Sequence, residues 1–178
     1  LAEVLPARLE QVVRGFAFSR SMRWDDSGLR FPRSIRWVCA LLDSEPVEVA
    51  VVRSGRVSYG HRFTHGAVEI PSAGGYAETL REAGVEPDRA ERFKQITAGL
   101  DALGEWSDPA GVLDEVVHLV ESPIVLEGRF DERFLQLPER VIVTTMQSHQ
   151  RYFPLGGDRF AFVANGGDPD VVRAGNEA

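Results

Sequence analysis

The stretch Leu137-Pro-Glu-Arg-Val-Ile-Val-Thr-Thr-Met-Gln-Ser-His-Gln-Arg-Tyr-Phe-Pro154 decides whether the second half of the chain is mainly helical. Pro138 and Glu139 favour a helix that starts here, because proline is well tolerated in a first helical turn. The β-branched run 141–145 favours a strand instead, since branched side chains lose rotamer freedom in a helix. The stretch therefore predicts a helix from Pro138 to about His149, with a strand as the alternative.

Helical periodicity is also present elsewhere in the chain, where apolar residues recur three and four positions apart. Pro87 and Asp88 are typical of a helix start. The predicted helical segments are 3–16, 76–83, 87–103, 113–120 and a single turn at 131–135. Short apolar strands are predicted at 124–126 and 159–164, followed by a loop at 165–169.

The front of the chain has a different character, with short β-branched and aromatic runs separated by turn residues. The predicted strands are 30–31, 35–42, 47–52 and 56–59. The fold class is therefore α+β, with a hairpin-rich mixed or antiparallel sheet packed with several helices. Trp24, Phe31, Ile35, Trp37, Val38 and Leu41 are expected to share one core. Residues 1–20 are interpreted as an N-terminal helix or linker, and residues 21–178 as a single α+β module of a larger polypeptide.

Charge and composition restrict the partners. The net charge of −7 argues against a domain that binds nucleic acid over its whole surface, but residues 1–36 carry seven Arg against four acidic residues. Any nucleic-acid contact should therefore be local. The lone Cys39 lies in an apolar run and is interpreted as a buried, inert thiol that suits a reducing cytosol. No apolar run approaches 18 residues, so no membrane span and a cytoplasmic location are expected.

Motifs for catalysis and metal binding are not recognisable. His61 and His65 flank an expected strand end without further clustered ligands, whereas zinc needs three or four. Ser148 and His149 are adjacent, so on a helix they point about 100° apart and cannot act as a nucleophile and its base. No phosphate-binding glycine loop and no nucleophile elbow is present. We expect no catalytic residue, no metal and no cofactor in this chain.

Clusters that interleave cations with aromatic rings are the candidate sites, because such residues stack on unpaired bases and pair with phosphates. The alternative is that the rings face the core and the Arg stems cover them. The candidate residues for contact with RNA or a protein partner are Arg33, Arg36, His61, Arg62, His149, Gln150, Arg151 and Tyr152. In the last cluster, Met146 and Phe153 are expected to support the site from beneath.

Several short strings resemble, in the same order, the beta subunit of the bacterial tetrameric glycyl-tRNA synthetase. They are Ser21-Met-Arg-Trp24, Phe31-Pro-Arg-Ser-Ile-Arg-Trp37, Ser54-Gly-Arg56, Gly60-His-Arg-Phe63, Leu113-Asp-Glu-Val116, Leu119-Val-Glu-Ser-Pro123, Gly128-Arg-Phe-Asp131, Ser148-His-Gln-Arg-Tyr-Phe153 and Gly175-Asn-Glu177. The family often has Pro where Ser34 stands, and Thr or Cys near the position of Tyr59.

The resemblance implies an aminoacyl-tRNA synthetase component that functions in protein biosynthesis. In that family the alpha subunit holds the site that activates glycine with ATP and Mg²⁺, while the beta subunit is needed for tRNA binding and charging. The implied partners are the alpha subunit and tRNA(Gly), and the implied fold is similar to an editing-type module. The chain would be a fragment without a catalytic centre. The alternatives are a purely structural scaffold that contacts alpha or other beta domains, and a hydrolytic editing module, which glycine's small size makes unnecessary.

Overall fold

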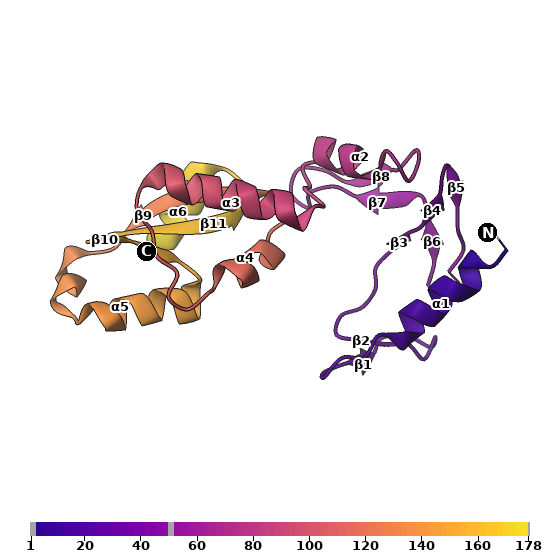
Figure 1. The fold of residues 1–178 in the computed structure, drawn as a ribbon, viewed down its shortest axis with the longest axis horizontal. Coiled ribbons are helices and arrows are strands. Elements are labelled where there is room, and N and C mark those ends of the chain that lie inside the picture. Colours follow the sequence, from indigo (N-terminus) through magenta and orange to yellow (C-terminus); the bar gives the residue numbers. More distant parts are fainter. Residues whose placement is uncertain (1–2, 50–51, 178) are drawn as a thin grey trace. The chain divides into compact units, whose positions relative to one another are not determined.

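The computed structural model describes residues 3–49 and 52–177 and has the expected α+β architecture (Figure 1). The chain forms two compact units, Leu1–Ala83 and Gly84–Ala178, each described here by itself. The boundary between these two units, after Ala83, differs from the organisation predicted from the sequence, in which residues 1–20 precede a single module 21–178. The organisation predicted from the sequence stays a prediction.

The first unit consists of short strand pairs between two helices. Its elements are α1 (Leu5–Gly15), β1 (Met22–Arg23), β2 (Arg30–Phe31), β3 (Val38–Cys39), β4 (Leu41–Leu42), β5 (Glu45–Pro46), β6 (Ser54–Gly55), β7 (Val57–Tyr59), β8 (Ala67–Glu69) and α2 (Tyr76–Glu82). The pairs β1–β2, β4–β5 and β7–β8 are antiparallel, and β3–β6 is parallel. The predicted hairpin-rich front is thereby confirmed.

The expected core of the first unit is wrong, because the predicted strand 35–42 is broken at Ala40. On either side of it, β3 pairs with β6 and β4 pairs with β5, so the described strands form separate two-stranded pairs instead of one wide sheet face that could cover the tryptophans. Trp24 and Trp37 are 47% and 39% exposed. Cys39, expected to be buried, is half-buried, and this burial raises the pKa of its thiol. The buried apolar residues are instead Val47, Val49, Ile70, Leu80 and Ala83. Of the predicted strand 47–52, residues 50 and 51 lie outside the described residues.

The second unit is built on a three-stranded antiparallel sheet in the order β10–β11–β9. Its elements are α3 (Arg89–Leu103), α4 (Leu113–Leu119), β9 (Pro123–Arg129), the 3-10 helix η1 (Glu132–Gln136), α5 (Glu139–Thr145), the π-helix η2 (Met146–Gln150), β10 (Phe153–Gly156), β11 (Arg159–Asn165) and α6 (Pro169–Glu177). Asp88 caps α3 by accepting from the amide of Ala90 at 2.7 Å, as its place before the helix predicts. The helix predicted after Pro138 is confirmed, and the strand alternative is wrong.

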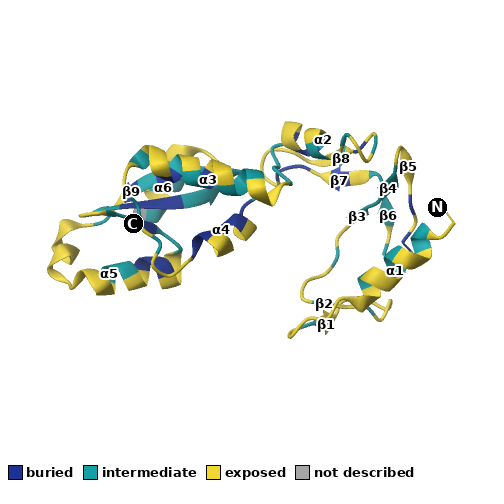
Figure 2. Cartoon of the chain, viewed as in Figure 1, coloured by how far each residue is buried: buried dark blue, intermediate teal, exposed yellow. Residues whose placement is uncertain are grey.

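Two apolar clusters hold the second unit together. The larger contains Ile96 and Leu100 of α3, Val116 and Val117 of α4, and Phe153 of the sheet. The smaller consists of Leu126, Met146, Phe160 and Phe162. Figure 2 shows these buried positions on the strands and on α4, whereas α1 of the first unit is mainly exposed. Among the described helices, none combines the length and apolar character needed to cross a membrane.

Candidate nucleic-acid interface

The predicted cluster at 149–152 lies where α5 ends in an unusual way. The helix widens into the π-helix η2, and Arg151 follows with a left-handed backbone, φ 58°. Non-glycine residues seldom adopt this conformation, and π-helical turns are frequent at functional sites. Two backbone bonds close the turn, from the Arg151 amide to the Gln147 carbonyl at 3.3 Å and from the Tyr152 amide to the Met146 carbonyl at 3.1 Å.

Gln147 anchors this turn to the segment that begins α4. Its side chain is 1% exposed, and its Oε1 accepts from the Ala110 amide at 2.9 Å. Its Nε2 donates to Asp108 Oδ1 at 3.1 Å, and the same carboxylate accepts from the amides of Val112 and Leu113 at 2.8 and 3.0 Å. Every polar atom of the buried amide thus has a partner, which makes the position of the turn specific.

Arg151 and Tyr152 are engaged by their own unit. The Arg151 guanidinium pairs with Glu115 at 3.0 Å and donates to the Ser148 carbonyl at 2.8 Å. The Tyr152 ring stacks on Phe160 with centroids 4.7 Å apart, and its hydroxyl donates to Asn176 Oδ1 at 2.5 Å. Burial raises the pKa of Tyr152, so the hydroxyl keeps its proton.

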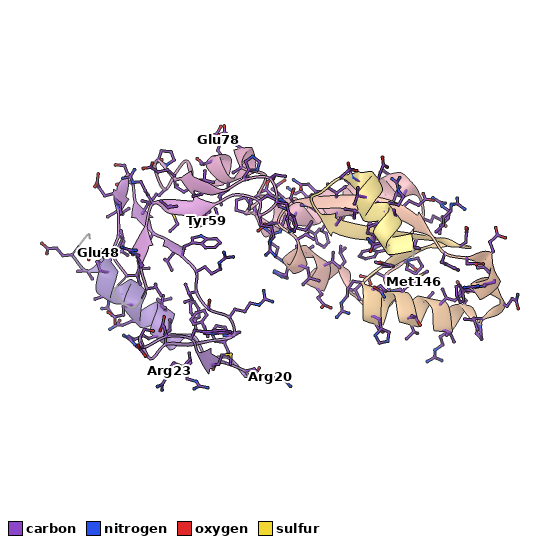
Figure 3. All side chains as sticks on the ribbon, turned by 180° about the vertical axis from the view of Figure 1, so that it is seen from behind. Arg20, Arg23, Glu48, Tyr59, Glu78 and Met146 are labelled. Carbon is purple, nitrogen blue, oxygen red and sulfur yellow. The ribbon has the colours of Figure 1, made fainter. Side chains whose placement is uncertain are left out.

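The exposed residues of this cluster are His149 and Gln150. Beneath them Met146 and Phe153 are buried, in the supporting positions expected from the sequence; Figure 3 labels Met146 between the helix end and the sheet. A groove of about 580 Å³ runs beside the turn, and its lining includes Gln150, Tyr152, Phe134, Val141 and Ile142. The structure thus groups the four predicted residues but leaves two of them open to a partner.

In the first unit, the segment Gly60-His61-Arg62-Phe63 is a tight turn at the end of β7. A Cβ atom on Gly60 would lie 2.6 Å from the His65 Cβ and 2.7 Å from the Ala83 carbonyl oxygen, so only a glycine allows this close backbone approach. His61 is 2% exposed, and its amide donates to the Ala83 carbonyl at 2.9 Å. Arg62 is exposed. Phe63 is 75% exposed and therefore lies outside the core.

An exposed group of three side chains, which we term the Trp37 platform, consists of Arg36, Trp37 and Tyr59. The rings of Trp37 and Tyr59 lie with centroids 4.4 Å apart at an angle of 51°. The Arg36 guanidinium carbon lies 5.7 Å from the Trp37 ring centroid, within cation–π range. Figure 3 shows the Tyr59 ring on the side of its strand away from Glu78 of α2. Tyr59 was not among the predicted site residues; the alternation of Val57, Ser58 and Tyr59 was its only signal.

The arginines of the two units differ in their ion pairing. Within the part of the chain that the structure describes, eight exposed arginines of the first unit have no carboxylate within ion-pair distance: Arg8, Arg20, Arg23, Arg30, Arg33, Arg36, Arg53 and Arg62. In the second unit, six arginines are paired with carboxylates: Arg89 with Asp114, Arg129 with Asp158, Arg133 with Asp131, Arg151 with Glu115, Arg159 with Glu127, and Arg173 with Asp170. Among the described residues, exposed arginines without an ion pair are therefore concentrated in the first unit, and Arg140 of α5 is a further one in the second unit.

Within residues 3–49 and 52–177, no group of three His, Cys, Asp or Glu side chains is arranged to hold a metal ion. The expectation of no metal site stays a prediction.

Comparison with known proteins identifies relatives over nearly the whole chain. The family model for the glycyl-tRNA synthetase beta subunit matches residues 1–178. The glycine–tRNA ligase beta subunit of Bacillus subtilis is 39% identical over 184 residues, which cover 95% of this chain and 27% of that protein. The corresponding subunit of Moorella thermoacetica is 38% identical, over 92% of this chain and 26% of that protein. The glycine–tRNA ligase of Chlamydia trachomatis is 35% identical, over 99% of this chain and 19% of that protein. The chain thus spans about a quarter or less of these relatives' length, and it belongs to the glycyl-tRNA synthetase beta subunit family.

Proposed function

We propose that this chain is part of the beta subunit of a cytoplasmic glycyl-tRNA synthetase and supports the ATP-dependent attachment of glycine to tRNA(Gly). Its contribution is tRNA binding and assembly with the alpha subunit. ATP and Mg²⁺ act at a site elsewhere in the enzyme, and this chain contributes no catalytic residue. The observation that carries the proposal is the group of unpaired, exposed arginines in the first unit of a chain from this family.

The arginines act by electrostatic attraction to the phosphates of the RNA backbone. A guanidinium without an internal carboxylate partner keeps its full charge and its donors for an external anion. Arg33, Arg36 and Arg62 meet this condition and are assigned direct contacts. His149 and Gln150, exposed in the second unit, are assigned a peripheral contact with tRNA or with a neighbouring domain.

The remaining predicted residues are assigned a positioning role. His61 holds the turn after β7 from its buried position, while Arg151 and Tyr152 hold the end of the π-helix through Glu115 and Asn176. Their substitution should therefore act on tRNA binding only through the geometry of the exposed residues that they support.

The test uses the complete beta subunit assembled with its alpha subunit. Arg33→Ala and Arg62→Ala should each weaken tRNA(Gly) binding and reduce the slope of log affinity against log salt by about 0.7–0.9, the value for one phosphate contact. Glycine-dependent pyrophosphate exchange should remain unchanged, because that reaction needs no tRNA. The matched control is Arg173→Ala, since Arg173 is ion-paired with Asp170 at 3.2 Å. Equal salt slopes for all three variants and the parent enzyme would refute the proposal.

A scaffold function is the second candidate, and the η1–α5 segment favours it. Phe134, Leu135, Leu137 and Val141 are each more than 40% exposed, and α5 has no buried residue. Exposed apolar residues gathered on one segment are typical of protein contacts. If this surface binds the alpha subunit or another beta domain, Val141→Glu should weaken that association, while Arg140→Glu on the same helix should not. Loss of association without any change in tRNA binding by the arginine variants would favour a pure scaffold.

A further inference from the structure

We propose that the Trp37 platform is a stacking site for one unpaired base of RNA, with Arg36 contacting the phosphate of the same or the adjoining nucleotide. This inference rests on the proposed role in tRNA binding and specifies where and how one nucleotide is held.

The two rings are held in place by backbone structure on both sides. Trp37 directly precedes β3, whose Val38 and Cys39 pair with Ser54 and Gly55 of β6. Tyr59 ends β7 and pairs with Ala67 of β8. Immediately after Tyr59, the Gly60 amide donates to the Gly66 carbonyl at 3.0 Å, and the buried His61 fixes the turn. Tyr59 therefore lies in a paired strand and Trp37 directly before one, so backbone pairing restricts both rings before any ligand binds.

Both rings of the Trp37 platform are partly exposed to solvent, whereas an aromatic pair in a core would be buried. Trp37 is 39% exposed and Tyr59 is 43% exposed, although they contact each other. Large aromatic surface left in water is unfavourable, and preorganised rings of this kind are the usual sites on which proteins stack unpaired bases. Stacking needs only a flat π surface, so such a site accepts any of the four bases.

The charge around the Trp37 platform favours a nucleotide as the ligand. A protein surface without planar rings would not use the exposed aromatic faces. Arg36 lies beside the Trp37 ring and Arg33 precedes it by four residues in the same segment, and neither is paired with a carboxylate of the described residues. A nucleotide combines a flat base with a negatively charged phosphate that is joined to it through the sugar. The arrangement of ring and guanidinium complements both parts at once.

The experiment measures binding of a tRNA(Gly) transcript to the complete beta subunit assembled with its alpha subunit. Trp37→Ala and Tyr59→Ala should each weaken binding by about tenfold. They should leave the salt slope unchanged because no charge is removed. Trp37→Phe keeps a flat ring and should retain most of the affinity. The matched control is Phe63→Ala, which removes a ring of the same unit that is 75% exposed and lies outside the platform. A fully paired RNA duplex serves as the second probe, and its affinity should not respond to Trp37→Ala.

Three outcomes would overturn the stacking site: wild-type tRNA affinity for both alanine variants, an equal loss for the duplex, or loss of alpha-subunit association in place of tRNA affinity. The last result would make the platform a protein contact. Thermal unfolding of each variant shows whether the fold is kept, and Trp37→Phe remains informative if Trp37→Ala unfolds. If Arg33→Ala and Arg62→Ala weaken tRNA binding but the ring variants do not, only the stacking site fails. If neither set has an effect, the proposed tRNA contact fails as well.

Discussion

Arg151 forms an ion pair with Glu115 across 36 residues of sequence, its Nε and Nη2 both donating to Glu115 Oε1 at 3.2 and 3.0 Å. The pair ties the left-handed residue after the π-helix to α4. It also neutralises the cation that, from the sequence, was the most attractive phosphate ligand of the second unit. Because of this ion pair, removal of Arg151 should affect the stability of the fold but not the salt dependence of RNA binding.

Arg151→Ala should lower the free energy of unfolding of the chain by about 0.2–1 kcal/mol, because the pair is partly exposed and screened by water. In the assembled enzyme, the salt dependence of tRNA binding should not change. Urea unfolding and binding titrations at several salt concentrations measure the two effects. A slope reduced by nearly one charge would contradict this and would restore Arg151 as a direct phosphate ligand.

Gln147→Met tests the anchor of the same turn. The substitution keeps the volume but leaves the Ala110 amide without its acceptor and removes one of the two donors to Asp108 Oδ1, which should cost about 1–3 kcal/mol. Gln150→Met, three residues away on an exposed position, should change stability by less than about 0.5 kcal/mol. Chemical unfolding of both variants under the same conditions gives the comparison, and equal losses would mean that the amide network is unimportant.

The helices α1 to α5 and the strands β9 and β11 follow from local sequence patterns, which explains why they were predictable within a few residues. β10 was missed because Pro154 and Gly156 are poor strand residues, and its pairing with β11 compensates for them. α6 was missed because Pro169, Gly175 and Asn176 resemble a loop. In the structure, Arg173 of this helix donates to the Glu127 carbonyl and Asn176 accepts from Tyr152, contacts with distant residues that no local pattern contains.

The candidate site shows the same limit. The sequence indicated which segments combine cations with rings, but not which side chains the protein itself occupies. Whether Arg151 is free depends on Glu115, and whether Trp37 is buried depends on how the run 35–42 divides between two partners. Both are questions of long-range pairing. Local propensity therefore located the clusters, and tertiary contacts decided their roles.

Trp37→Ala should cost about 1–2 kcal/mol, less than the about 3–5 kcal/mol expected for a fully buried aromatic residue. The difference arises because the ring is 39% exposed and its neighbours are partly exposed too. Phe153→Ala is the matched comparison, since Phe153 is fully buried between α3, α4 and the sheet. Thermal or urea unfolding measures both, and a larger loss for Trp37→Ala would return that ring to a core.

Glu127 gives the second unit a defined response to acid. The hydrogen bond from Arg159 holds the pKa of this carboxyl below its ordinary value of 4.5, with Arg129 and Arg173 adding to the effect. A group whose pKa is lowered in the folded state stabilises the fold above its unfolded pKa, and this contribution is lost as pH falls through the lower folded value. Stability should therefore decline from about pH 4.5 downward, and Glu127→Gln should flatten that decline. Melting temperatures recorded across this range test it, with Glu105→Gln as an exposed control that should follow the parent curve.

Gly99→Ala should destabilise the chain although alanine is the better helix former. In an exposed helix interior this change stabilises by about 1 kcal/mol. At position 99 the new Cβ would lie 2.5 Å from Cγ2 and 2.7 Å from Cβ of Val125, so α3 would have to move away from β9. Overpacking of this kind typically costs about 1–3 kcal/mol, which exceeds the gain in helix propensity.

Gly175→Ala is the matched control, because a Cβ at that position of α6 meets no atom within 4 Å and should be neutral or stabilising. Because Val125→Ala keeps the Cβ that causes part of the clash, it should relieve the Gly99→Ala defect only in part. Unfolding measurements on the two single variants and the double variant check this, and full rescue by Val125→Ala would show that the helix and strand approach each other less closely than the structure indicates.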